Sequence, residues 1–228
     1  MTAPRYGFVR ANALSLVFGG LFLVTLVGQA VAGVADHNAR QVSEGLPEIS
    51  LLDYVTSSSF GVDVMENWQS EYLQFLLYVF ATVWLVQRGS SESKEPGQEG
   101  TESDEEQQVG RDAHGESPAW ARTGGWRTAV FSRSLGLLMA ALFLLTWAAS
   151  SVAGWAAFNA EQLGQRQDPV SWAGYLGEAD FWNRSFQNWQ SEMLAVGSMA
   201  VFAVYLRQRG SPESKPVGAA HADTGQTG

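Results

Sequence analysis

The sequence is a tandem duplication: at an offset of 121 residues, and without a gap, the first half aligns with the second. The segment Asn-Trp-Gln-Ser-Glu at 67–71 returns at 188–192, and Gln-Arg-Gly-Ser at 87–90 returns at 208–211. Roughly a third of the positions between 8 and 97 are identical in the two copies, as expected of repeats that share one fold. Each half is therefore one structural unit, and the residues kept in both copies should serve that unit.

The apolar residues of each half are gathered into two blocks. From 13 to 35 the only polar side chains are Ser15, Thr25 and Gln29, and no charge interrupts the run. As a helix this run is roughly 34 Å long, enough to cross a hydrocarbon layer of about 30 Å. The second blocks, 72–86 and 193–206, reach that length only with the polar segment before them. We predict an all-α polytopic membrane protein with four transmembrane helices, at about 13–35, 67–87, 134–158 and 188–208.

The N-terminal region also resembles a secretory signal peptide, because a basic start precedes an apolar stretch and small residues follow. The apolar run is longer than the core of about 7–15 residues that is typical of such signals. Its equivalent at 134–158 lies in the middle of the chain, where no signal can stand. We therefore expect the first block to remain as a membrane helix.

Basic residues predict the orientation of these helices. One side has Arg5, Arg10, Arg88, Arg127, Arg133, Arg207, Arg209 and Lys215, and the other has only Arg40, Arg166 and Arg184. The excess of basic residues indicates the cytoplasmic side, so we place both termini and the linker there. Each hairpin then returns to its starting side, and the two tandem hairpin repeats are parallel, related by a pseudo-two-fold axis along the membrane normal.

This interpretation divides the chain into four parts: membrane hairpin repeat 1 (1–97), an acidic disordered cytoplasmic linker (98–125), membrane hairpin repeat 2 (126–216) and a disordered tail (217–228). Between 91 and 117 nine acidic residues face two basic ones, so most of the net charge of −9 belongs to the linker region. We expect short helices in the outer loops, where Ser50 and Ser171 can begin them and Asp53 completes a capping pattern.

Glu71 and Glu192 are the candidate titrating site, with Asn67 and Asn188 four residues before them on the same helix face. Two interpretations stay open. In one, amide and carboxylate form a hydrogen-bonded knot that fixes helix to loop. In the other, the axis brings Glu71 and Glu192 together as a proton- or cation-responsive pair. Gln74 and Tyr78 extend this polar face only in the first half, which disfavours a continuous aqueous channel.

Two further groups of residues have structural interpretations. Trp68 and Trp189 are expected near the headgroups, as interfacial aromatic residues. Small residues at a spacing of four let helix backbones approach each other closely in lipid. These predicted packing positions are Gly28, Ala32 and Gly33 in the first helix and Ala149, Ala153 and Gly154 in the third.

A family resemblance rests on the stretch Ser-Phe-Gln-Asn-Trp-Gln-Ser-Glu at 185–192 and on Leu-Arg-Gln-Arg-Gly-Ser-Pro-Glu-Ser-Lys-Pro at 206–216. They resemble an uncharacterised family of bacterial four-pass membrane proteins, the domain of unknown function 6766. The likeness covers both halves and leaves out only the tails. It implies the bacterial cytoplasmic (inner) membrane and transfers no catalytic or binding residue.

The predicted function is that of a non-enzymatic integral membrane protein with a structural role or one that acts on lipid or a partner. The alternative is a small transporter or ion- or proton-coupled component that uses Glu71 and Glu192. The sequence has no cysteine, and its three histidines are scattered, so we expect no metal and no cofactor. The expected partners are the lipid bilayer and either another membrane protein or a second copy of this chain. We expect no nucleic-acid binding, because the sequence has no dense basic patch.

Overall fold

The computed structural model describes residues 7–226, and this part of the chain is helical with no strand. Its long helices are α2 (Ala13–Ser43), α4 (Ser58–Trp84), α7 (Ser134–Gly164) and α9 (Ala179–Tyr205). The bounds of α7 and α9 are those of α2 and α4 moved by 121 residues. The prediction of an all-α fold is confirmed.

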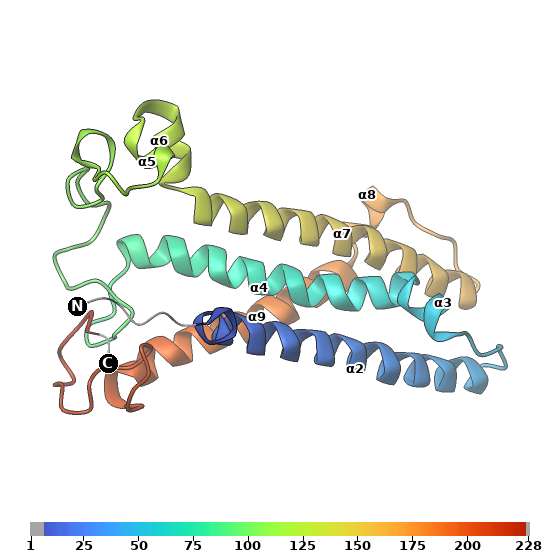
Figure 1. Cartoon of the computed structure of the whole chain (residues 1–228). Coiled ribbons are helices and arrows are strands. Elements are labelled where there is room, and N and C mark those ends of the chain that lie inside the picture. The colour runs from blue at the N-terminus through green and yellow to red at the C-terminus, as the bar shows by residue number, and fades with distance from the viewer. Residues whose placement is uncertain (1–6, 227–228) are drawn as a thin grey trace.

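Short elements gather at the two ends of these helices. They are α1 (Phe8–Ala11), α3 (Leu51–Val55), the 3-10 helix η1 (Gly110–Asp112), α5 (Ala119–Arg122), α6 (Gly125–Phe131) and α8 (Trp172–Tyr175). Figure 1 shows the linker and the C-terminal residues at one end, here called the linker end, and α3 and α8 at the other, the loop end. Helices α2 and α7 run towards the loop end, and α4 and α9 return.

The helices extend beyond the predicted spans at the loop end, whereas α4 and α9 end at Trp84 and Tyr205, three residues before the predicted ends at 87 and 208. Helix α4 begins at Ser58 rather than 67, because the Ser57 side chain caps it by accepting a hydrogen bond from Phe60 N. Helices α2 and α7 continue to Ser43 and Gly164 through polar residues. The outer loops are correspondingly shorter than the predicted spans imply. An apolar run marks where lipid would be favourable, but backbone hydrogen bonds and caps decide where a helix ends.

The two turns at the loop end are built in the same way. Asn38 Nδ2 donates to Ile49 O at 3.0 Å and its Oδ1 accepts from Ile49 N at 2.9 Å. Asn159 makes the same pair of bonds with Val170, each at 2.9 Å. The predicted caps of the short helices are also present, since Ser50 and Asp53 form a capping box and Ser171 caps α8.

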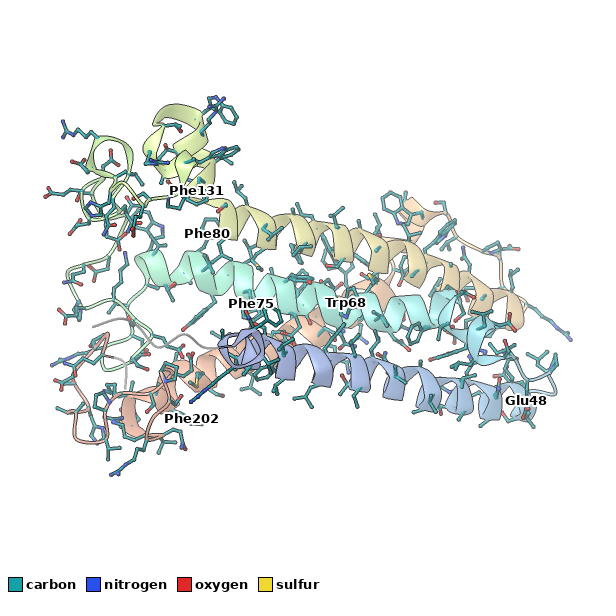
Figure 2. All side chains as sticks on the ribbon, in the orientation of Figure 1. Glu48, Trp68, Phe75, Phe80, Phe131 and Phe202 are labelled. Carbon is teal, nitrogen blue, oxygen red and sulfur yellow. The ribbon has the colours of Figure 1, made fainter. Side chains whose placement is uncertain are left out.

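Helix α4 packs most closely against α7, in antiparallel orientation. At one end of this pair, a Cβ on Gly61 would lie 3.6 Å from Ala153 Cβ. At the other, a Cβ on Gly136 would lie 3.0 Å from Phe80, which Figure 2 shows on the side of α4 that faces α7. Small residues thus bring the two backbones together.

The equivalent pairing of α9 with α2 is not made. Where α4 has Gly61, α9 has Trp182, and a large indole prevents an equally close approach. The Trp182 ring packs instead with its centroid 6.2 Å from that of Trp147 on α7. Helix α2 consequently keeps a broad apolar surface uncovered, with no buried residue along its length.

The whole molecule exposes far more surface than a compact globule. Its accessible area is 15544 Å², whereas about 10,000 Å² is expected for a compact soluble monomer of 24.8 kDa. Much of the excess comes from large apolar side chains on α2 such as Leu14, Phe18 and Val24. Such a surface needs lipid or another protein to cover it.

At the linker end, the segment after each returning helix forms a similar loop. Gln87 N donates to Ser93 Oγ, and Gln208 N donates to Ser214 Oγ, both at 2.9 Å. Residues of the predicted linker form η1, α5 and hydrogen-bonded turns. The C-terminal segment packs on the first loop, where Gly89 N donates to Thr224 Oγ1 at 2.9 Å.

Candidate functional site

Helices α4 and α9 cross at the Asn-Trp-Gln-Ser-Glu segment that both repeats contain, and this crossing brings the two candidate carboxylates together. The charge of Glu192 acts on Glu71 across the crossing. Ser70 Oγ lies 3.4 Å from Glu192 Oε1 and is buried. Glu71 and Glu192 occupy equivalent positions, 121 residues apart. The crossing therefore brings two acidic residues near each other, with Glu71 exposed and Glu192 half-buried.

Beside the two carboxylates lies a buried amide. Gln69 is fully buried, and its Oε1 accepts a hydrogen bond of 2.9 Å from Trp189 Nε1. Among the residues that the structure describes, Gln69 Nε2 has no acceptor. An unpaired buried amide donor costs about 1–3 kcal/mol. The crossing therefore favours an acceptor from outside the chain, such as water.

The side-chain N–H groups of the two asparagines bond to the backbone of their own helices, and not to the glutamates as the knot, one of the two interpretations, would require. Asn67 Nδ2 donates to Asp63 O at 2.8 Å, and Asn188 Nδ2 donates to Arg184 O at 2.9 Å. Both amides thus bond back to the preceding helical turn, which satisfies them locally and leaves the carboxylates to other partners. Their role is the same in both halves and is structural.

The two candidate interfacial tryptophans pack against the preceding long helix. The Trp68 ring lies 5.8 Å from Phe22 on α2, and the Trp189 ring lies 6.3 Å from the equivalent Phe143 on α7. In the second half this contact belongs to a larger aromatic group on α7 and α9, which also contains Trp147, Phe181, Trp182 and Phe186. The indole N–H of Trp189 donates a hydrogen bond to Gln69 Oε1.

The candidate packing residues have different environments. Gly33 and Gly154 lie directly against the rings of Tyr54 and Tyr175, which leave no room for a Cβ. Ala153 contacts Gly61 on α4. Gly28, Ala32 and Ala149 are exposed, and a Cβ on Gly28 would meet no atom within 4 Å.

An ionic network at the loop end joins the two halves, and none of its residues was predicted as a site from the sequence. Arg184 Nη1 lies 3.3 Å from Glu66 Oε1, and Arg184 Nε lies 3.0 Å from Asp180 Oδ2. Tyr175 OH donates to the same Asp180 oxygen at 3.0 Å. A usable signal existed, because Asp63 and Arg184 have opposite charges at equivalent positions, which a two-fold axis brings near each other.

Burial dominates the electrostatics of this network. It raises the pKa of Glu66 above its ordinary value, although the charge and hydrogen bond of Arg184 act in the opposite direction. Burial likewise raises the pKa of Asp63, again opposed by Arg184. Burial and the neighbouring Asp180 carboxylate raise the pKa of Tyr175. The single arginine therefore offsets part of the desolvation of several acids.

A second pair of equivalent carboxyl groups lies at the linker end. Glu92 lies near Glu213, 121 residues later, since its neighbour Ser91 donates from Oγ to Glu213 O at 3.1 Å, and Tyr78 OH on α4 donates to Glu92 Oε2. Burial and the Glu213 carboxyl raise the pKa of Glu92, and the Tyr78 hydrogen bond opposes them. Glu92 also lines a polar cavity of about 510 Å³, together with Thr82, Ser91, Ser93, Lys94, Glu95, Gln98 and Gly225.

Comparison with known proteins adds a family but no activity. A family model described as "Domain of unknown function (DUF6766)" matches residues 5–226. The match includes the tail as far as 226, so the expectation that the likeness leaves out the tails was wrong for 217–226. No curated protein and no solved structure matches the chain.

Proposed function

The chain belongs to the DUF6766 family, and we propose that it is a non-enzymatic integral membrane protein that acts through its helix surfaces on lipid or a membrane partner. Two helices of the described chain, α2 and α7, are long and apolar enough to span a membrane. The observation that carries the proposal is the uncovered apolar surface of α2, which lacks the burial of a core helix. Water is a poor solvent for such a surface, and lipid is a good one.

In the proposed arrangement all four long helices cross the membrane as two parallel hairpin repeats. Helices α4 and α9 have apolar parts of thirteen residues, 72–84 and 193–205, about 20 Å long. Of their polar remainder, Gln69 and Ser70 are buried where the two helices cross. The linker end is cytoplasmic, because the basic residues flanking the helices concentrate there, and the membrane is the bacterial cytoplasmic one.

Extraction from membranes tests this proposal. The expressed chain is expected to sediment with membranes, to resist washing with alkaline carbonate and to dissolve in detergent. A chain that stays in the aqueous fraction without detergent would refute it. Release by carbonate alone would point to a peripheral protein and would equally contradict four crossings.

A second function is supported by one specific observation, the interaction of Glu71 with Glu192 beside the unpaired amide of Gln69. Two neighbouring carboxyl groups inside a membrane favour a shared proton or a bound cation over two free charges. We propose, as this alternative, an ion- or proton-coupled membrane component. Proton flux into proteoliposomes tests it, because the double variant Glu71→Gln with Glu192→Gln would abolish that flux while an unchanged flux would exclude a role for the pair.

A further inference from the structure

The two acid pairs are connected by one polar face of α4. Glu71, Gln74, Tyr78 and Thr82 follow at steps of three or four residues, so they share a helix face. Glu71 and Tyr78 are seven residues apart, about 10 Å along the axis, and Gln74 lies between them. The face thus begins at the Glu71 and Glu192 pair and ends beside Glu92.

The linker end of this face opens to water. Tyr78 OH donates to Glu92 Oε2, and Glu92 and Thr82 both line the polar cavity of about 510 Å³. The other charged groups at the cavity are Lys94 and Glu95, with Glu213 behind Glu92. The Lys94 ammonium is already engaged, since its Nζ lies 2.6 Å from Gly100 O and 2.5 Å from Glu102 Oε1. Among the described residues that line the cavity, Lys94 is thus bound elsewhere and is not paired with Glu92.

At the other end of the face, near Glu71, an unpaired side chain indicates a bound polar group such as water. The fully buried Gln69 keeps an unpaired Nε2 at the crossing, where Trp189 bonds to Gln69 Oε1 and Glu192 contacts the neighbouring Ser70. Buried polar groups are normally hydrogen-bonded. A water here would accept from Gln69 and donate to the acid pair.

We propose that this face of α4 is a proton path that leads from the Glu71 and Glu192 pair through Tyr78 to the Glu92 and Glu213 pair and the polar cavity. The inference rests on the proton-coupled alternative proposed above and adds its linker-end half. The path needs no continuous aqueous channel. The equivalent face of α9 has Ala195 and Met199 in place of Gln74 and Tyr78, so it offers no second path of this kind.

Each transfer conserves protons and changes no oxidation state. A proton held between Glu71 and Glu192 passes to water ordered by Gln74. Tyr78 gives its phenolic proton to Glu92 along the existing hydrogen bond and takes one from that water. Glu92 then releases its proton to water in the cavity. Glu213 shares the proton of Glu92 and keeps a second negative charge from developing there.

Proton flux through reconstituted full-length protein, driven by a potassium diffusion potential, tests the path. Tyr78→Phe removes one hydroxyl and is expected to lower the flux at least about tenfold, and Glu92→Gln should do the same. Tyr72→Phe, on the same helix but off this face, is the matched control and should leave the flux unchanged. Equal thermal unfolding of the three variants in detergent ensures that folding is not the cause.

The outcomes separate the two proposals. Flux that depends on Glu71 and Glu192 but survives both Tyr78→Phe and Glu92→Gln would overturn the path and leave the coupled function standing. Absence of flux in the unaltered protein would overturn both. Infrared titration gives an independent readout: the path predicts a protonated carboxyl band near neutral pH that disappears in Glu92→Gln, and its persistence would contradict the shared proton at Glu92 and Glu213.

Discussion

The same asparagine closes the loop-end turn of each half, but its surroundings differ. Within the described part of the chain, Asn38 is the one side chain that donates a hydrogen bond to Ile49 O, at 3.0 Å. Val170 O accepts from Asn159 at 2.9 Å and also from Trp155 Nε1 at 2.8 Å. Identical residues therefore need not contribute equally to stability.

Replacing each asparagine by aspartate tests this difference. The carboxylate can still accept from the backbone N–H but cannot donate to the carbonyl. Asn38→Asp leaves Ile49 O unpaired and should destabilise the protein by about 1–3 kcal/mol. Asn159→Asp should cost less, because Trp155 still donates to Val170 O. Thermal unfolding in detergent measures both, and an equal or reversed order would contradict the assignment.

We expect the contribution of Arg184 to the stability of the fold to depend on pH, because Arg184 neutralises nearby carboxylates. Folded-state pKa values of Glu66 and Asp63 lie above their ordinary 4.5 and 3.8, so their contribution to stability is present below those values and is lost as pH rises through the folded pKa. Removing Arg184 raises both folded pKa values further. The resulting loss of stability is therefore largest at neutral pH, where both acids are ionised, and becomes smaller towards pH 4.5.

We expect Arg184→Gln to lower the free energy of unfolding by about 1–2 kcal/mol at neutral pH, a modest value because the pair is partly exposed. The difference from the unaltered protein should shrink on acidification. Arg166→Gln, an exposed arginine in the second loop-end turn, serves as the control and should change little. If the stability lost in Arg184→Gln becomes larger towards pH 4.5, the proposed role of Arg184 is contradicted.

At the scale of elements, one exchange explains why the two halves pack differently. Gly61 allows α4 to approach α7, whereas Trp182 at the equivalent position turns α9 towards an aromatic group with Trp147. Duplication predicts matching helices and loop-end turns, and the bounds agree. Which helices touch depends on single side chains that differ between the copies, and the repeat alone cannot predict that.

Enlarging Gly61 should separate α4 from α7. Gly61→Leu places a bulky side chain against Ala153, 3.6 Å from the added Cβ, and is expected to destabilise the protein by about 1–3 kcal/mol. Gly28→Leu makes the same change on α2 where no atom lies within 4 Å of the Cβ, so it should be nearly neutral. If both variants unfold at the same temperature, the close pairing of α4 with α7 is wrong.

The candidate site was predictable in part. Equivalent positions of a two-fold repeat meet on its axis, which is why the sequence indicates the Glu71 and Glu192 pair. Burial of Gln69 and the hydrogen bond from Tyr78 to Glu92 were not foreseen, because both depend on how α4 crosses α9 and how the segment after α4 turns back. The local bond of Asn67 to Asp63 O competed successfully with the expected bond to Glu71.

At the scale of the whole molecule, the linker and the C-terminal residues share one end of the helices and the short helices α3 and α8 share the other (Figure 1). This arrangement and the open apolar surface of α2 fit a protein whose chain enters and leaves the membrane twice from one side. A soluble fold of this length would instead cover α2. In such a protein the linker end and the loop end lie on opposite sides of the membrane.

Cysteine labelling tests that claim most directly, since the chain has no native cysteine. Exposed positions suit it: Glu48 and Gln167 at the loop end, and Glu105 and Val217 at the linker end. In intact cells a membrane-impermeant maleimide should label Glu48→Cys and Gln167→Cys, and should reach Glu105→Cys and Val217→Cys only after permeabilisation. Labelling of Glu105→Cys in intact cells, at the rate of Glu48→Cys, would contradict the account.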